Sequence, residues 1–393
     1  MDSAVGFDSS GFDDLTIESL RGSGSVKWST FPDRIGAFVA EMDFGTAPAV
    51  SAALHEAVDR GVFGYLPGAV LTPMQEACAA WSRTVYGWDV PAANVRPLPD
   101  VISALQAAIE HFCTPGSPVI LPTPAYMPFL TVPPAMGREI IQVPMLREAG
   151  RDVYDLDGLD AAFRAGGNLL ILCNPHNPIG RVLERDEMEA IAAVVERHGG
   201  RVFSDEIHAP LVFSGHKHVP YASISDATAG HTVTAASASK AWNLPGLKCA
   251  QLILSNDADV ATWREVGMMP EHGAANLGVI ANTAAYSAGG QWLTDVLRYL
   301  EGNRDVLSDL VAEHLPGADC TPAEGTYLAW IDCRALDLGP EPGGFFAEHA
   351  SVALVDGSAC GDAGTGFVRY NFATPRPIMV RALEQMGAAL ARR

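Results

Sequence analysis

The sequence predicts an α/β protein with a mostly parallel sheet covered by helices on both faces, followed by a smaller α+β domain. From about residue 47, segments with helical spacing of apolar residues alternate with short apolar runs, which favours strand–helix units of a parallel sheet. After about residue 285 a long helical stretch precedes short strand-like segments. The 393 residues, 48% of them hydrophobic, are too many for one compact domain and enough for a large core.

The elements follow in chain order. In the large domain, helices are predicted over 48–63 and 102–112, and strands over 117–122, 168–175, 201–206 and 231–239. In the small domain we predict a helix over 289–315 and strands over 327–332, 352–357 and 367–373. The chain therefore divides into an N-terminal arm with part of the small domain (1–46), a large domain (47–285) and a C-terminal small domain (286–393).

Charge and cysteine content restrict the class of protein. The formal charge is −20, with 46 acidic and 26 basic residues and no basic stripe that could hold nucleic acid or an anionic membrane. The seven cysteines form no Cys-x-x-Cys pair and suit reduced, buried thiols. The N-terminus is polar and acidic, and no apolar run is long enough to span a bilayer. We expect a soluble, cytoplasmic protein that acts on a small molecule.

Side chains that could take part in catalysis lie at the ends of three predicted strands. Ligands of open α/β sheets gather beyond the carboxyl ends of the strands. Lys240 follows an apolar strand in "SASKAWNLPGLKCA" and is a candidate Schiff-base former. Taken alone, a lysine at this position is more often a solvated surface residue that begins a helix. Asn174 and Asp205 end two further strands. An amide, a carboxylate and an amine are thus predicted to face one crevice.

The peptide "SDEIHAPLVF", with "HKH" at 216–218, also raises the possibility of a metal site. Its Asp-x-x-His spacing on a strand end matches no standard ligand pattern, so we expect no metal. Glu206 should point to the opposite face from Asp205 and be structural. His216 and His218 are predicted to lie on a solvated loop.

Four peptides together resemble a known family: "KWSTFPDRIGAFVAEMDFGTAPAV", "CNPHNPIGRV", "SDEIHAPLVF" and "SKAWNLPGLKCA". They resemble the pyridoxal 5'-phosphate (PLP) enzymes of the aspartate-aminotransferase fold, fold type I, over nearly the whole chain. Within that superfamily they are similar to the MalY/PatB-like cystathionine beta-lyases, which are carbon–sulfur lyases. Most aminotransferases of this fold have tyrosine three residues after the aspartate, whereas His208 is typical of the lyase group. The resemblance implies a seven-stranded sheet in the large domain and PLP as cofactor.

The resemblance also implies roles around the cofactor ring. Lys240 would hold PLP and take the substrate Cα proton. Asp205 would keep the pyridine nitrogen protonated, so that the ring accepts electron density. His208 and Asn174 would lie near the phenolic oxygen, with Asn174 also on the substrate side. Tyr126 would stack on the ring, and its alternative is a core aromatic.

The phosphate group needs backbone donors at a helix start. Val101 and Ile102 would offer these after Asp100, which we expect to cap the helix because its charge would repel the anion. By resemblance, the remaining phosphate ligands are Ser237, Ser239 and Lys248. Tyr65 matches a tyrosine that reaches the phosphate of a neighbouring subunit, which implies a homodimer with active sites at the interface.

Arg369 in "GFVRYNFATPRP" would hold the substrate α-carboxylate by two parallel hydrogen bonds, with a structural salt bridge as its alternative. Tyr327 and the "AEMDF" loop would line the substrate side, and neither Tyr327 nor Asp43 is assigned a catalytic role.

By resemblance, we expect a PLP-dependent β-elimination that cleaves the Cβ–S bond of L-cystathionine or other cysteine S-conjugates to a thiol, pyruvate and ammonia. An aminotransferase is the main alternative, because the same lysine, aspartate and arginine support both reactions. A regulatory protein that has kept the fold is a second alternative. The presence of all three residues, with no appended DNA-binding segment, disfavours it.

Overall fold

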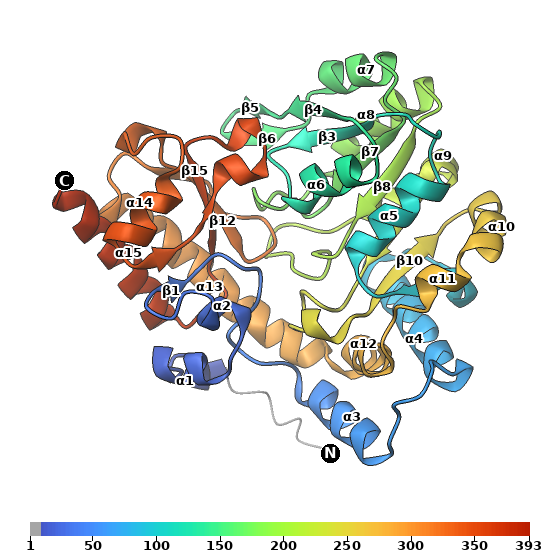
Figure 1. The fold of residues 1–393 in the computed structure, drawn as a ribbon, viewed down its shortest axis with the longest axis horizontal. Helices are drawn as coiled ribbons and strands as arrows, with labels where there is room; N and C mark the ends of the chain where they lie inside the picture. Colours follow the sequence, from blue (N-terminus) through green and yellow to red (C-terminus); the bar gives the residue numbers. More distant parts are fainter. Residues whose placement is uncertain (1–8) are drawn as a thin grey trace.

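The computed structural model describes residues 9–393, so residues 1–8 of the predicted arm lie outside the described residues. Its centre is a seven-stranded sheet (Figure 1). β10 runs antiparallel to both of its neighbours, and every other adjacent pair is parallel, which confirms the predicted α/β class. In spatial order the strands are β2 (Val95–Leu98), β10 (Ala250–Leu254), β9 (Thr232–Ala236), β8 (Arg201–Asp205), β7 (Leu169–Cys173), β3 (Val119–Thr123) and β4 (Ile140–Pro144).

Helices bury both faces of this sheet. Successive side chains of a strand point to opposite faces, so in β7 Ile171 packs into one apolar cluster and Leu170 and Leu172 into another. This explains why β3 and β7 are buried along their whole length and read as continuous apolar runs. The first cluster includes α5 (Val101–His111), α6 (Pro128–Ala135) and α10 (Asp257–Val266), and the second includes α7 (Leu156–Arg164) and α8 (Arg185–Arg197).

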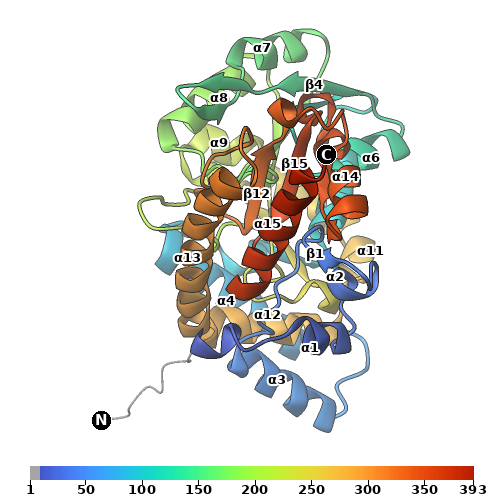
Figure 2. The ribbon, with the colours of Figure 1, turned by 90° about the vertical axis from the view of Figure 1, so that its left-hand side faces the viewer.

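A helical layer connects the large sheet to the C-terminal part. α12 (Asn276–Ala288) packs against α3 (Pro48–Asp59) and α4 (Gly68–Trp81). The long α13 (Gly290–His314) then lies beside α15 (Arg376–Ala391) (Figure 2). The predicted boundary at 285/286 falls in the last turn of α12, and the division into domains stays a prediction.

The smaller sheet is antiparallel, in the order β11 (Asp319–Cys320), β12 (Leu328–Asp332), β15 (Phe367–Asn371) and β14 (Val355–Asp356). α14 (Pro342–His349) precedes β13 (Val352–Ala353). β13 pairs in parallel with β1 (Ile35–Gly36), so the N-terminal segment lies beside the C-terminal elements (Figure 1). Segment 37–45 follows β1, and its residues 38–40 supply one wall of the site described below.

Short elements complete the described chain. Within residues 9–393, no helix combines the length and apolar composition that crossing a bilayer requires. The remaining α-helices and strands are α1 (Ile17–Gly22), α2 (Val26–Ser29), α9 (Asp226–His231), α11 (Met268–Glu271), β5 (Leu146–Glu148) and β6 (Arg151–Val153).

Candidate active site

A cavity of about 370 Å³ lies beyond the carboxyl ends of β7, β8 and β9, between the large sheet, the smaller sheet and segment 38–40. Adjacent parallel strands end at the same edge, which is why residues far apart in sequence meet here. Most of the predicted site residues line it: Val101, Ile102, Tyr126, Asp205, His208, Ser239, Lys240, Lys248 and Arg369.

Lys240 lies in this cavity, and its Nζ donates a hydrogen bond to the carbonyl oxygen of Ala40 at 3.0 Å. Burial, followed by the charge of Arg369, lowers the pKa of this amine to about 8. The carboxylates of Glu41 and Asp205 act in the opposite direction. About a tenth of the amine is therefore unprotonated at pH 7, far more than for an ordinary lysine, and this is the form that a nucleophile or general base requires.

Asp205 is the last residue of β8 and is buried at the edge of the cavity. Its Oδ1 accepts a hydrogen bond from the Ile207 amide at 3.0 Å. Burial raises the pKa of the Asp205 carboxyl to about 7, and the Ile207 bond and Lys240 only partly offset this. A cationic N–H donor placed against Asp205 would restore its charge.

His208 lies beside Asp205 and is buried. Burial, and then the charges of Lys240 and Arg369, lower the pKa of the imidazole well below its ordinary value, so the ring is neutral. Its Nδ1 is buried and has no hydrogen-bond partner within residues 9–393. Because His208 lines the cavity, this atom is free to form a hydrogen bond with a ligand bound there.

Arg369 comes from β15 and is buried against the cavity. Its Nη1 donates to Oδ1 of Asn177 at 3.1 Å, and its Nη2 donates to the Phe38 carbonyl at 2.8 Å. Within residues 9–393 these partners are neutral and Nε has none, so the arginine is not in the structural salt bridge considered above. A buried guanidinium without a counter-ion is suited to binding a carboxylate.

The N-terminus of α5 forms the opposite end of the cavity. Asp100 caps the helix, because its Oδ1 accepts from the Ser103 amide at 2.8 Å and from the Ser103 hydroxyl at 2.8 Å. This confirms the predicted cap. Val101 and Ile102 follow directly, and the first amides of a helix have no partner within it. Lys248 lies nearby, with Nζ 3.1 Å from Oδ2 of Asp100.

Asn174 does not line the cavity, contrary to prediction. Its side-chain oxygen accepts from the Leu183 amide at 3.0 Å, and its Nδ2 lies 3.7 Å from the Met188 sulfur. These contacts turn the side chain into the core beside α8. Asn177, three residues further along the same peptide, lines the cavity instead and contacts Arg369.

The hydroxyl groups of Ser237 and Tyr327, two further predicted site residues, bond to backbone carbonyls. The Ser237 hydroxyl is buried and donates to the Cys249 carbonyl at 2.8 Å. Tyr327 is buried, and its hydroxyl donates to the Ala40 carbonyl at 2.9 Å. Neither lines the cavity. Tyr327 instead holds the same carbonyl that accepts from Lys240.

The predicted solvated loop is wrong for His218, which is buried with Nε2 2.9 Å from Oε2 of Glu206. Oε1 of Glu206 accepts from the Tyr221 amide at 3.0 Å, which agrees with a structural role for this carboxylate. His216 is exposed, as predicted. Among residues 9–393, no group of three or more histidine, cysteine or acidic side chains is arranged to bind a metal ion.

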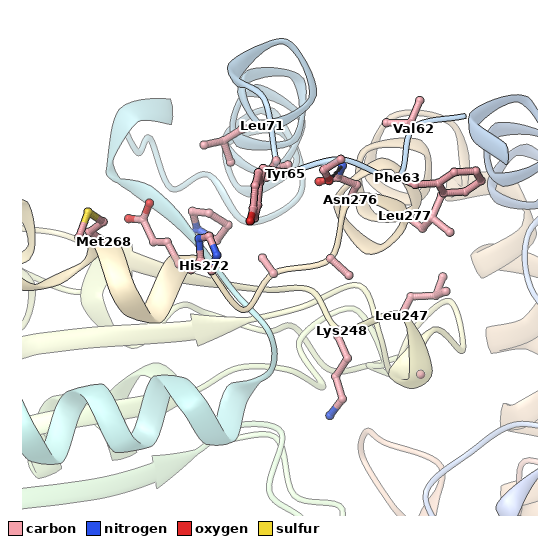
Figure 3. Close-up of a pocket in the computed structure, with 17 residues that line it drawn as sticks. Val62, Phe63, Tyr65, Leu71, Leu247, Lys248, Met268, His272, Asn276 and Leu277 are labelled. Atoms are coloured by element: carbon pink, nitrogen blue, oxygen red, sulfur yellow. Dashed lines mark hydrogen bonds between the residues drawn. The ribbon is translucent and has the colours of Figure 1, made fainter. Parts of the chain in front are cut away.

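Tyr65 lies outside the cavity of its own chain and is 86% exposed. It lines an adjoining cavity of about 700 Å³, which shares Lys248 with the first (Figure 3). Figure 3 shows the Lys248 amine pointing away from Tyr65 and His272, whose rings are 5.5 Å apart. Phe63 and Met268 are exposed apolar side chains that line the same cavity.

A seven-stranded sheet with a buried aspartate at the end of one strand and a partly buried lysine shortly after the end of the next defines an enzyme of the aminotransferase type. The chain belongs to the family of class I and II aminotransferases, which matches residues 38–385.

The chain is also similar to proteins with a named activity. The chain is 36% identical to the cystathionine beta-lyase of Corynebacterium glutamicum, over 95% of this chain and 99% of the relative. It is 33% identical to the cystathionine beta-lyase PatB of Bacillus subtilis (strain 168), over 95% and 98%. The structure superposes on the PLP-bound C–S lyase of Staphylococcus hominis with a TM-score of 0.89 and 28% identity, covering 97% of this chain and 99% of that one.

Proposed function

We propose that this protein is a PLP-dependent lyase that cleaves the Cβ–S bond of L-cystathionine or related cysteine S-conjugates and releases a thiol, pyruvate and ammonia. The observation that carries the proposal is the meeting of Lys240, Asp205, His208 and Arg369 in one buried cavity. The full-length similarity to cystathionine beta-lyases supports the reaction type.

Each chemical group of PLP has a suitable partner among the residues at the cavity. Lys240 offers an amine of lowered pKa to the aldehyde, and Asp205 offers a carboxylate to the pyridine N–H. The unpartnered Nδ1 of His208 and the Asn177 amide are available to the phenolic oxygen. Tyr126 borders the space for the ring. The phosphate would bind at the N-terminus of α5 beside Ser239 and Lys248, a typical anion site.

Arg369, Lys240 and Asp205 have different roles in the proposed reaction. Arg369 binds the substrate α-carboxylate in two parallel hydrogen bonds and so orients the Cα–H bond. Nζ of Lys240 accepts the Cα proton, which its lowered pKa allows near neutral pH. When bound, PLP supplies an electron sink for the electron pair left on Cα. Asp205 would stabilise the protonated pyridine nitrogen. The thiolate leaves from Cβ and takes up a proton, and one water molecule hydrolyses the remaining three-carbon fragment to pyruvate and ammonia.

Amino transfer is the competing reaction, and product analysis separates the two. The purified protein is incubated with L-cystathionine while free thiol and pyruvate are followed, and a parallel reaction contains 2-oxoglutarate. We expect equal amounts of thiol and pyruvate without any keto acid. Turnover only in the presence of 2-oxoglutarate would make the protein an aminotransferase.

The two asparagines of "NPHNP" should differ in their effects. Asn177→Ala removes a cavity-facing amide and the Arg369 contact, so we expect kcat/KM to fall by about 10- to 100-fold. Asn174→Ala should leave kcat/KM within about threefold and instead lower stability by roughly 1–3 kcal/mol, because it removes the partner of the Leu183 amide. Steady-state kinetics and thermal unfolding measure both. The reverse pattern would return the catalytic role to Asn174.

We infer that two copies of the chain form the active unit. Tyr65 and the exposed Phe63 and Met268 line a cavity that shares Lys248 with the active site. Tyr65 of a partner chain would complete the phosphate site there. Light scattering of the purified protein should give twice the 41.6 kDa chain mass, and a monomer with full activity would exclude this arrangement.

A reducing cytoplasm is proposed as the location of the protein, because all seven cysteines are free thiols.

A further inference from the structure

An ion pair between Asp100 and Lys248 lies at the end of the cavity assigned to the phosphate group. Lys248 Nζ is 3.1 Å from Oδ2 of Asp100, and both residues line the cavity. The other oxygen, Oδ1, is bound by the amide and hydroxyl of Ser103. The two oxygens of Asp100 therefore have separate functions, one as helix cap and one as partner of Lys248.

The charge of Asp100 opposes the binding of an anion at this end. Burial would raise the pKa of the Asp100 carboxyl, but the Ser103 hydrogen bonds and Lys248 outweigh it and hold the pKa below its ordinary value. The carboxylate is therefore ionised at neutral pH and cancels the charge of Lys248. Its side chain is 38% exposed and that of Lys248 is 58% exposed, so solvent and salt reach the pair.

We propose that Asp100 is a positioning residue that fixes Lys248 beside the α5 N-terminus and, by its charge, limits the affinity of the site for the phosphate group. This inference rests on the proposed function, because it takes PLP as the ligand. The phosphate cup then has no net side-chain charge from this pair, and backbone amides supply much of the attraction. The cofactor is held less tightly than an unpaired lysine would hold it.

The variant Asp100→Asn separates the two functions of the residue. Asparagine is as good a helix cap as aspartate, so α5 keeps its start while the negative charge disappears. Equilibrium dialysis of the full-length, cofactor-free protein should show a Kd for PLP lower by on the order of tenfold at low ionic strength. Added salt should reduce this gain, because it screens exposed charges. Inorganic phosphate should compete with PLP more strongly in the variant.

Pyridoxal, which lacks the phosphate, is the matched ligand control, and its Kd should be unchanged by Asp100→Asn. Asp337→Asn is the matched protein control, because it removes the same charge at a side chain that is 99% exposed. Asp100→Ser, also a good cap, provides a second neutral variant.

Unchanged or weaker PLP binding in both well-folded Asp100 variants would overturn the inference, as would a gain seen equally with pyridoxal. Circular dichroism establishes that each variant is folded. Failure of the wild-type protein itself to bind PLP would instead overturn the proposed function, and this inference with it.

Discussion

Replacing Lys240 with alanine should lower kcat by about 10⁴-fold or more, because the change removes both the amine that holds the cofactor and the base that takes the Cα proton. The folded structure should remain, since within residues 9–393 the Lys240 amine has only the Ala40 carbonyl as hydrogen-bond partner. Loss of this partly buried amine, whose pKa desolvation lowers, should not reduce the free energy of unfolding of the cofactor-free protein. Thiol release from L-cystathionine and thermal unfolding measure the two effects.

The chain offers a matched control, because its sequence has only four lysines, at positions 27, 217, 240 and 248. Lys217 is exposed and lies outside the cavity. Lys217→Ala should therefore retain wild-type kcat. A Lys240→Ala protein that kept more than about a tenth of wild-type kcat would fall outside the range expected for loss of a general base and would remove Lys240 from the mechanism.

Replacing Asp205 with asparagine should change activity and stability in opposite directions. The amide cannot hold the pyridine nitrogen protonated, so kcat should fall by about 10³-fold. At pH 8 the cofactor-free variant should be more stable than the wild type by on the order of 2 kcal/mol, because a buried negative charge is removed. The gain is smaller than the full cost of that charge, because burying the polar amide also costs free energy. Product assays and denaturant unfolding of the cofactor-free protein test the two parts.

The raised pKa of Asp205 also predicts how the stability of the cofactor-free protein changes with pH. Burial raises the pKa of the Asp205 carboxyl from 3.8 to about 7, so the folded protein retains a proton that the unfolded chain releases. The contribution of Asp205 to stability therefore decreases as pH rises between about 4 and 7. Asp205→Asn should flatten this part of the profile, whereas Asp89→Asn, at a side chain that is 82% exposed, should not. An unchanged profile in Asp205→Asn would contradict the buried, proton-binding state of the carboxyl.

Much of the fold could be predicted because apolar periodicity is a local property of the sequence. The helix expected over 289–315 is α13 (Gly290–His314), and the strand expected over 201–206 is β8. Strand direction and partner choice are not local. The strand expected over 352–357 is interrupted at Leu354, because β13 pairs with β1 and β14 pairs with β15. The antiparallel direction of β10 likewise depends on its neighbours in space.

The site was predictable where a side chain ends a strand, as for Asp205, or follows a strand within a few residues, as for Lys240. It was not predictable where the path of the backbone determines which side chain faces the cavity. Asn174 and Asn177 share one peptide, and only the turn after β7 determines which amide faces the cavity. The backbone carbonyls of Phe38 and Ala40 accept hydrogen bonds from Arg369 and Lys240. Every residue has such a carbonyl, so residue type could not identify them.

All of the proposed chemistry requires that PLP be held on Lys240. The most direct measurement is borohydride reduction of the protein with bound PLP, followed by protease digestion and mass spectrometry of the four lysine positions. We predict one reduced pyridoxyl group per chain, on the peptide that contains Lys240. Labelling of Lys248 or Lys217 in its place, or no label on a protein that turns over L-cystathionine, would contradict the proposed active site.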